Sequence, residues 1–313
     1  MKQDQKIRVA IGGLGTIGLT LARAFARGIE GFELVAVSAQ DHAAAAQRLS
    51  DLALSIPVLP PAELEAHADL LIEAAPAALL TSFARPFLAK GKSVVVLSVA
   101  ALAAHPELID LARAHGAQIL VPSGALLGLD GVVAAAQGEI HSVRLVTRKP
   151  PLGLSVGAID APLRLFAGTA REAAQKFPAN LNVAASLAFA GLGLDRTQVE
   201  IWADPGVTRN VHRVEVESES ATFSMTIENV PSENPKTSKM TALSVLALLR
   251  NMRAPLRIGS GGEKDGSRFA RQSGAHLWRE RWIGWRHGQY AGNRGRESRA
   301  GGAQWRSACQ SCR

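Results

Sequence analysis

The sequence predicts an α/β protein with a doubly wound parallel sheet and a second, α+β domain. Short apolar runs alternate with helical patterns over residues 1–122, and a glycine-rich turn follows the first of these runs. After residue 122 the strand-like segments instead alternate apolar and polar residues. We therefore divide the chain into a first, Rossmann-type domain over 1–122 and a second domain over 123–236, followed by a helix at 237–252 that returns to the first domain.

The first domain is predicted to consist of strands that alternate with helices. Its strands are nearly continuous apolar runs, which is typical of a parallel sheet covered on both faces. The connections have the length of right-handed crossovers. The predicted strands are 6–11, 32–37, 70–73, 93–97 and 118–121, and the predicted helices are 19–27, 43–52, 79–90 and 106–115.

The second domain is predicted to hold an antiparallel sheet with one exposed face. Strict alternation of apolar and polar residues favours that arrangement. The predicted strands are 142–147, 198–203, 210–218 and 221–228, and two helices, 161–176 and 183–192, lie between the first and the second strand.

The glycine-rich turn is the pattern Gly13-x-Gly15-x-x-Gly18, placed between a strand and a helix. In this context the pattern indicates a dinucleotide site, because the glycines permit a tight turn, close approach of a pyrophosphate and close helix packing. The acidic residue expected at the end of the second strand is replaced by Ser38. The predicted cofactor is therefore NAD or NADP, with the choice open.

Charge and cysteine are concentrated at the C-terminal end. Residues 263–313 contain 11 of the 35 Lys and Arg and 4 of the 27 Asp and Glu, so most of the net charge of +8 lies there. The same segment has both cysteines, four of the five tryptophans and too few aliphatic residues for a core. The near-neutral, cysteine-free body argues against nucleic-acid binding, thiol catalysis and a cysteine-ligated metal in the two domains.

Three cations and one histidine are candidates for the chemistry of the second domain. Arg148 and Lys149 directly follow its first predicted strand, and Lys236 precedes the last helix. Each could bind an anionic substrate or simply be solvated. His212 is the one histidine within a predicted strand of this domain. It could be an acid–base group or a structural core histidine. No metal is required.

Several longer motifs carry a more specific resemblance. They are PSGALLGLD at 122–130, TRKPP at 147–151, FPANLNVAA at 177–185, ADP at 203–205, NVH at 210–212 and NVPSENPKTS at 229–238. With the glycine turn, this ordered series resembles the L-aspartate dehydrogenase family from about residue 7 to about residue 259.

The resemblance implies that the second domain is catalytic and pairs subunits into a homodimer. It implies that Ala125 and Asn182 contact the dinucleotide and that His212 is the active-site residue. The implied reaction is NAD(P)-dependent oxidative deamination of L-aspartate to oxaloacetate and ammonia through iminoaspartate, which in some organisms feeds pyridine nucleotide biosynthesis. We keep Arg148, Lys149 and Lys236 as candidates for binding the substrate carboxylates.

Two alternatives stay open from the sequence. One is a related dehydrogenase or reductase of another small dicarboxylic amino or imino acid, and the other is a nucleic-acid-binding protein that uses the basic, tryptophan-containing segment. The composition of 263–313 is typical of a shifted reading frame or a fused extension, so we regard that segment as a disordered or frameshift-like tail. Since no signal peptide or membrane-spanning run is recognised, we expect a cytoplasmic protein.

Overall fold

The protein is described by a computed structural model that covers residues 5–177, 181–232 and 238–258. The predicted tail at 263–313 and the candidate Lys236 lie outside these described residues. None of the helices within the described ranges is long and apolar enough to cross a membrane.

The first domain is the predicted doubly wound sheet, and that fold class is confirmed. Five parallel strands are arranged in the order β2-β1-β3-β4-β5. The chain order reverses between β1 and β3, which is the switch point at which open α/β sheets bind ligands. The strands are β1 Ile7–Gly12, β2 Phe32–Ser38, β3 Leu70–Glu73, β4 Ser93–Val96 and β5 Ile119–Leu120.

Helices cover both faces of this sheet because successive strand residues point to opposite sides. Val9 and Ile11 of β1 pack in the core beneath α1 and α2, whereas Ala10 belongs to the core beneath α3, α4 and α6. The helical elements of this domain are α1 Thr16–Ala26, α2 His42–Asp51, η1 Pro61–Glu63, α3 Leu64–His67, η2 Ala77–Leu79, α4 Leu80–Ala89, α5 Val99–Ala104 and α6 Glu107–His115.

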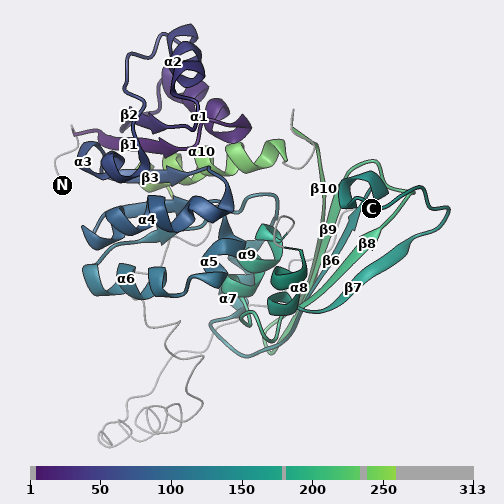
Figure 1. Ribbon diagram of the computed structural model, residues 1–313. Helices are drawn as coiled ribbons and strands as arrows, with labels where there is room; N and C mark the ends of the chain where they lie inside the picture. The colour runs from purple at the N-terminus through teal and green to yellow at the C-terminus, as the bar shows by residue number, and fades with distance from the viewer. Residues whose placement is uncertain (1–4, 178–180, 233–237, 259–313) are drawn as a thin grey trace, which may run out of the picture. The chain divides into compact units, whose positions relative to one another are not determined.

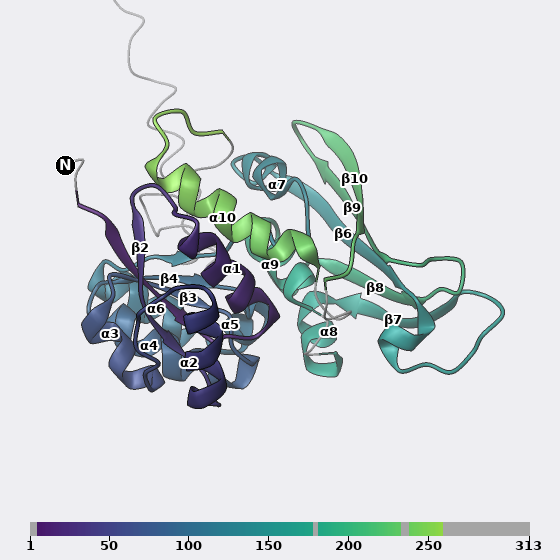
Figure 2. The ribbon, with the colours of Figure 1, turned by 90° about the horizontal axis from the view of Figure 1, so that it is seen from above.

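The last helix, α10 (Lys239–Arg253), returns to the first domain (Figures 1 and 2). Ser238 caps it by accepting a hydrogen bond from the Met240 N–H. Its seam of Ala242, Val245, Leu246 and Leu249 is buried in the same core as α1 and α2. The core of the first domain is therefore completed by residues that follow the whole second domain in sequence.

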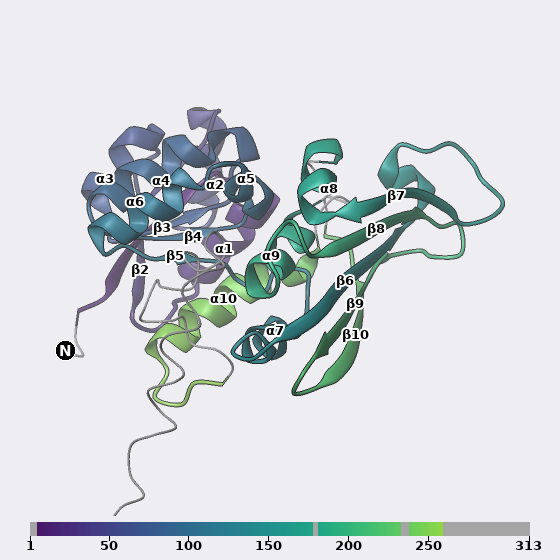
Figure 3. The ribbon, with the colours of Figure 1, turned by 90° about the horizontal axis from the view of Figure 1, so that it is seen from below.

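The second domain is a five-stranded sheet with helices on one face (Figure 3). Its strand order is β10-β9-β6-β8-β7. The elements are α7 Leu129–Ala135, β6 Ile140–Lys149, η3 Pro151–Leu154, β7 Leu163–Thr169, α8 Ala170–Lys176, α9 Asn182–Ala190, β8 Gln198–Ala203, β9 Asn210–Ser218 and β10 Thr222–Asn229.

Two sequence predictions for this domain were wrong. Residues 161–176 do not form one helix, because 163–169 is the edge strand β7 and a capping box between Thr169 and Glu172 starts α8 only at Ala170. The sheet is mixed rather than antiparallel, since β6 and β8 run parallel. Alternating polarity reports which face is buried, and it carries no information about the direction of the neighbouring strand.

Candidate active site

A cavity of about 520 Å³ lies at the carboxyl ends of β1, β3 and β4, where the first domain meets the second. It therefore occupies the switch point of the parallel sheet, and the second domain supplies its opposite wall. The residues that line it come from four groups: the glycine turn (Gly15, Thr16, Ile17), the ends of β3 and β4 (Ala74–Ala77, 96–99), the turn 122–125, and the second domain with the start of α10 (Lys149, Asn182, Val183, Ser186, Asn210, His212, Asn229, Ser238, Thr241).

The glycine turn has the shape that a pyrophosphate needs. Gly13 has φ of +101°, and a Cβ there would meet the carbonyl of Ala74 at 2.7 Å. A Cβ on Gly18 would collide with the carbonyl oxygen of Gly13, which brings α1 close to the turn. Gly15 is exposed, has no atom within 4 Å of its Cβ position, and caps the N-terminus of α1. The open space and the amide groups of the first helical turn fit a dinucleotide phosphate.

A buried carboxylate, Glu73, connects two turns of the cavity wall. It accepts hydrogen bonds from the N–H groups of Ala75 (3.2 Å), Leu97 (3.1 Å) and Ser98 (2.9 Å), and from the Ser98 hydroxyl (2.9 Å). Burial raises the pKa of Glu73, and these donors oppose the rise. In the sequence this residue was recognised only as the end of a strand, although an acidic residue that ends an apolar run is a usable signal.

The turn 122–125 is fixed by side chains from distant parts of the chain. The Gly124 N–H donates to the Ser244 hydroxyl of α10 at 3.0 Å. Asn229 donates to the carbonyl of Ala125 at 2.9 Å and accepts from the Ser238 hydroxyl at 2.9 Å. Ala125, a predicted cofactor contact, is thereby held at the cavity by the end of β10 and the start of α10.

Asn182, the second predicted contact for the dinucleotide, lines the cavity at the first residue of α9. Its amide oxygen accepts a hydrogen bond from the Ala100 N–H at 3.0 Å, near the start of α5. This bond joins the second domain to the first beside the cavity. The structure thus brings Ala125 and Asn182 to the same cavity as Gly15.

His212 and Lys149 form the wall contributed by the second sheet. Both are buried, with 4% and 7% of their surface exposed, and both line the cavity. Burial lowers the pKa of Lys149 to about 8. Burial, together with the neighbouring charge of Lys149, lowers the pKa of His212 to about 3. The imidazole is therefore neutral at physiological pH, beside a cationic amine.

Arg148 lies on the other face of the sheet from Lys149, as adjacent residues of a strand must. Its guanidinium donates to Asp204 at 2.8 Å and stacks over Trp202 at 5.0 Å from the ring centre. The ion pair is the main cause of a lowered pKa at Asp204. Arg148 is absent from the lining of the cavity described above. Within the described residues, no group of three His, Cys, Asp or Glu side chains could hold a metal ion.

A parallel sheet with a glycine turn at its switch point, closed by a second domain that presents a buried histidine and lysine, defines a two-domain nicotinamide-dependent dehydrogenase. Models of two families match the chain. Residues 13–122 match the NAD-binding domain of homoserine dehydrogenase, and residues 130–252 match the C-terminal domain of aspartate dehydrogenase. The chain belongs to the L-aspartate dehydrogenase family, and its cofactor is NAD or NADP.

Individual relatives agree with this assignment. The chain is 50% identical to L-aspartate dehydrogenase 3 of Bordetella bronchiseptica over 272 residues, which are 83% of this chain and 100% of that protein. It is 53% identical to L-aspartate dehydrogenase of Bradyrhizobium diazoefficiens over 268 residues, 82% of this chain and 95% of that protein. The crystal structure of aspartate dehydrogenase from Thermotoga maritima superposes with a TM-score of 0.66 at 25% identity, covering 82% of this chain and all of the other.

Proposed function

We propose that the protein catalyses the NAD(P)-dependent oxidative deamination of L-aspartate to oxaloacetate and ammonia through iminoaspartate, with His212 as the acid–base group. The observation that carries this proposal is that the buried side chains of His212 and Lys149 line the same cavity as the glycine turn. The family and the names of its members support aspartate as the substrate.

Oxidation begins with the loss of a proton from the substrate ammonium, because hydride leaves Cα readily only from the neutral amine. The dinucleotide, when bound, supplies the hydride acceptor at the cavity. His212 is neutral at physiological pH, which is the protonation state of a base. It takes the ammonium proton in the first half of the reaction.

Hydrolysis of the imine follows after the imidazolium has released the ammonium proton to the solvent, so that His212 is again a free base for a second proton transfer. A water molecule adds to the C=N carbon of iminoaspartate, and His212 removes a proton from that water. Collapse of the resulting carbinolamine breaks the C–N bond and releases ammonia, and the proton held by the imidazole goes to the leaving nitrogen. One water enters, one hydride goes to the cofactor, and oxaloacetate and ammonia leave. Two protons go to the solvent: the first ammonium proton and the hydroxyl proton that the carbinolamine loses when it becomes a ketone.

Lys149 is the group that we propose binds a substrate carboxylate. A buried ammonium at the cavity supplies the charge that an aspartate carboxylate needs, and burial strengthens such a pair. The same cation contributes to the lowered pKa of His212. A carboxylate placed against Lys149 compensates its charge and so makes the imidazole a stronger base when substrate is present.

The test is a steady-state assay on the purified full chain with NAD and with NADP, using L-aspartate and a panel that includes glutamate and other small dicarboxylic amino acids. We expect reduction of the dinucleotide with L-aspartate and loss of at least about a hundredfold in kcat for His212→Asn, the range typical of a lost acid–base group. Activity of that variant within twofold of the parent would refute the assigned role. A higher kcat/KM with another amino acid would refute L-aspartate as the substrate.

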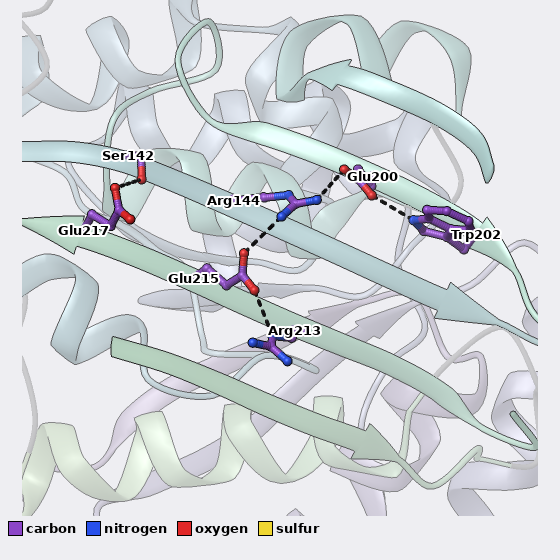
Figure 4. Close-up of polar contacts among 7 residues, drawn as sticks. All are labelled: Ser142, Arg144, Glu200, Trp202, Arg213, Glu215 and Glu217. Carbon is purple, nitrogen blue, oxygen red and sulfur yellow. Dashed lines mark hydrogen bonds and ion pairs between the residues drawn. The ribbon is translucent and has the colours of Figure 1, made fainter. Parts of the chain in front are cut away.

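We also propose that two copies pair through the helix-free face of the second sheet. This face displays its own charge network (Figure 4): Arg144 pairs with Glu200 at 2.6 Å and with Glu215 at 3.3 Å, and Arg213 pairs with Glu215 at 2.9 Å. Alternating charges of both signs suit a self-complementary, two-fold interface. Light scattering should give twice the chain mass, and Arg144→Glu should shift it toward the monomer. A monomeric parent would refute the pairing.

A further inference from the structure

A buried hydroxyl contacts the edge of the His212 ring that belongs to Nδ1. Thr147 Oγ1 lies 3.0 Å from that nitrogen, and the two residues are 5% and 4% exposed. They are direct partners in the antiparallel pairing of β6 with β9, and both point to the helix-covered face of the sheet. The contact is therefore fixed by the register of two central strands.

The hydroxyl is dedicated to the imidazole. Within the described part of the chain, the bond to His212 is the one hydrogen bond that the Thr147 side chain makes. His212 lines the cavity, whereas Thr147 does not. Because the two ring nitrogens lie on different edges of the imidazole, anchoring Nδ1 at Thr147 leaves Nε2 as the nitrogen available to the cavity.

A hydroxyl suits both states that an acid–base imidazole must adopt. It accepts from Nδ1–H when Nε2 is a bare base, and it still accepts from Nδ1–H after Nε2 has taken a proton. When the neutral ring instead carries its proton on Nε2, the same hydroxyl rotates and donates to Nδ1. Being uncharged, it adds no second charge beside Lys149.

We infer that Thr147 is a positioning residue that holds His212 with Nε2 toward the cavity and accommodates both tautomers through the reaction cycle. This inference rests on the proposed acid–base role of His212 for its kinetic consequence, but the ring orientation and tautomer are properties of the protein alone. Thr147 touches neither substrate nor cofactor in this assignment and acts through the imidazole.

The kinetic test compares three variants of the full chain. Thr147→Val keeps the shape and removes the hydroxyl, and Thr147→Ser keeps the hydroxyl. Thr197→Val makes the same deletion at a buried threonine of this domain whose hydroxyl has no partner within the described residues, and serves as the control. We expect Thr147→Val to lower kcat about tenfold, the effect of one lost hydrogen bond, with KM for the dinucleotide unchanged. Thr147→Ser should recover kcat to within about threefold, and Thr197→Val should match the parent.

The second readout does not depend on turnover. Nitrogen-15 spectra of histidine-labelled protein, with His212 assigned by its absence in His212→Asn, report which ring nitrogen carries the proton. We expect Thr147→Val to change the His212 resonances and Thr197→Val to leave them unaltered. Unchanged His212 resonances in Thr147→Val, or a Thr147→Ser variant as slow as Thr147→Val, would overturn the inference. An active His212→Asn enzyme would refute the proposed function, whereas the spectra would still decide the positioning role.

Discussion

Lowering the pH should lower the free energy of unfolding of this protein through the buried imidazole of His212. His212 has a pKa of about 3 in the folded protein, against 6.5 for the unperturbed side chain. Between these values the unfolded chain binds a proton that the folded protein excludes, so stability falls as the pH is lowered through this range. Each tenfold rise in proton concentration within the range costs about 1.4 kcal/mol, so lowering the pH from about 7.5 to about 4.5 should cost roughly 3 kcal/mol at this residue alone.

The measurement is urea unfolding of the parent and of His212→Asn at the two pH values. His212→Asn removes the titrating ring but retains a polar side chain near Thr147, so it is the matched variant. Every titratable group other than His212 is present in both proteins, so its contribution cancels in the comparison. Lys149 titrates near pH 8, above the window.

We expect the parent to lose about 3 kcal/mol more than His212→Asn between the two pH values, although the variant can be the less stable protein at neutral pH. Equal losses in the two proteins would show that the buried ring is not held neutral by its surroundings. That result would also remove the reason for proposing that His212 is neutral, and so able to act as a base, before substrate binds.

Three further predictions concern the cavity. Gly18→Ala should abolish dinucleotide binding, measured by fluorescence titration, because the new Cβ collides with the Gly13 carbonyl; retained affinity would contradict the geometry of the turn. Lys149→Met should raise KM for aspartate about a hundredfold, an effect of a few kcal/mol that is typical of a lost buried ion pair. Arg148→Met, on the opposite face of the sheet, should leave that KM within about threefold. Equal effects of the two substitutions would refute the role of Lys149 in binding the substrate carboxylate. Glu73→Gln should weaken dinucleotide binding about tenfold, since its amide N–H₂ opposes backbone donors; an unchanged Kd with a lowered Tm would make Glu73 purely structural.

The five strands and the helices α1, α2, α4 and α6 of the first domain followed from the sequence, because parallel strands and crossover helices leave separate signatures. The short helices α3 and α5 were not predicted. Helix α1 begins at Thr16, three residues before the predicted start at residue 19. Gly15 of the glycine turn is its N-cap, so the helix begins directly after that glycine. The prediction for 161–176 was wrong because the apolar residues of this segment also fit a helical spacing. The capping box at Thr169 is the local signal that separates β7 from α8.

Some residues of the candidate site could be recognised from the sequence, and others could not. The glycine turn was recognisable from local pattern. His212 stood out only as a histidine within a strand, and its predicted role came from the family resemblance. Strand alternation alone could have separated Lys149 from Arg148. The role of Thr147 was not accessible, because it depends on register: Thr147 faces His212 only through pairing between strands 65 residues apart. Glu73 carries a signal as an acidic residue that ends an apolar run, but its partners Leu97 and Ser98 could not be predicted from it. Likewise, the clamp of Asn229 on the turn 122–125 spans 104 residues of sequence.

The return of α10 has a consequence for how the chain is made. The first domain cannot complete its core until residues 239–253, which carry the buried seam of α10, have left the ribosome. Its sheet, by contrast, is complete by residue 120. During synthesis of the entire second domain, the surface of α1 that will meet α10 is exposed, and such surfaces favour chaperone binding or aggregation. The core of the second domain, by contrast, includes Val99 and Ala100 of α5, which are synthesised before it, and contains no residue of α10. During vectorial synthesis, all residues of the second core are therefore available before the set that makes up the first core is complete, although the first domain begins earlier in the sequence.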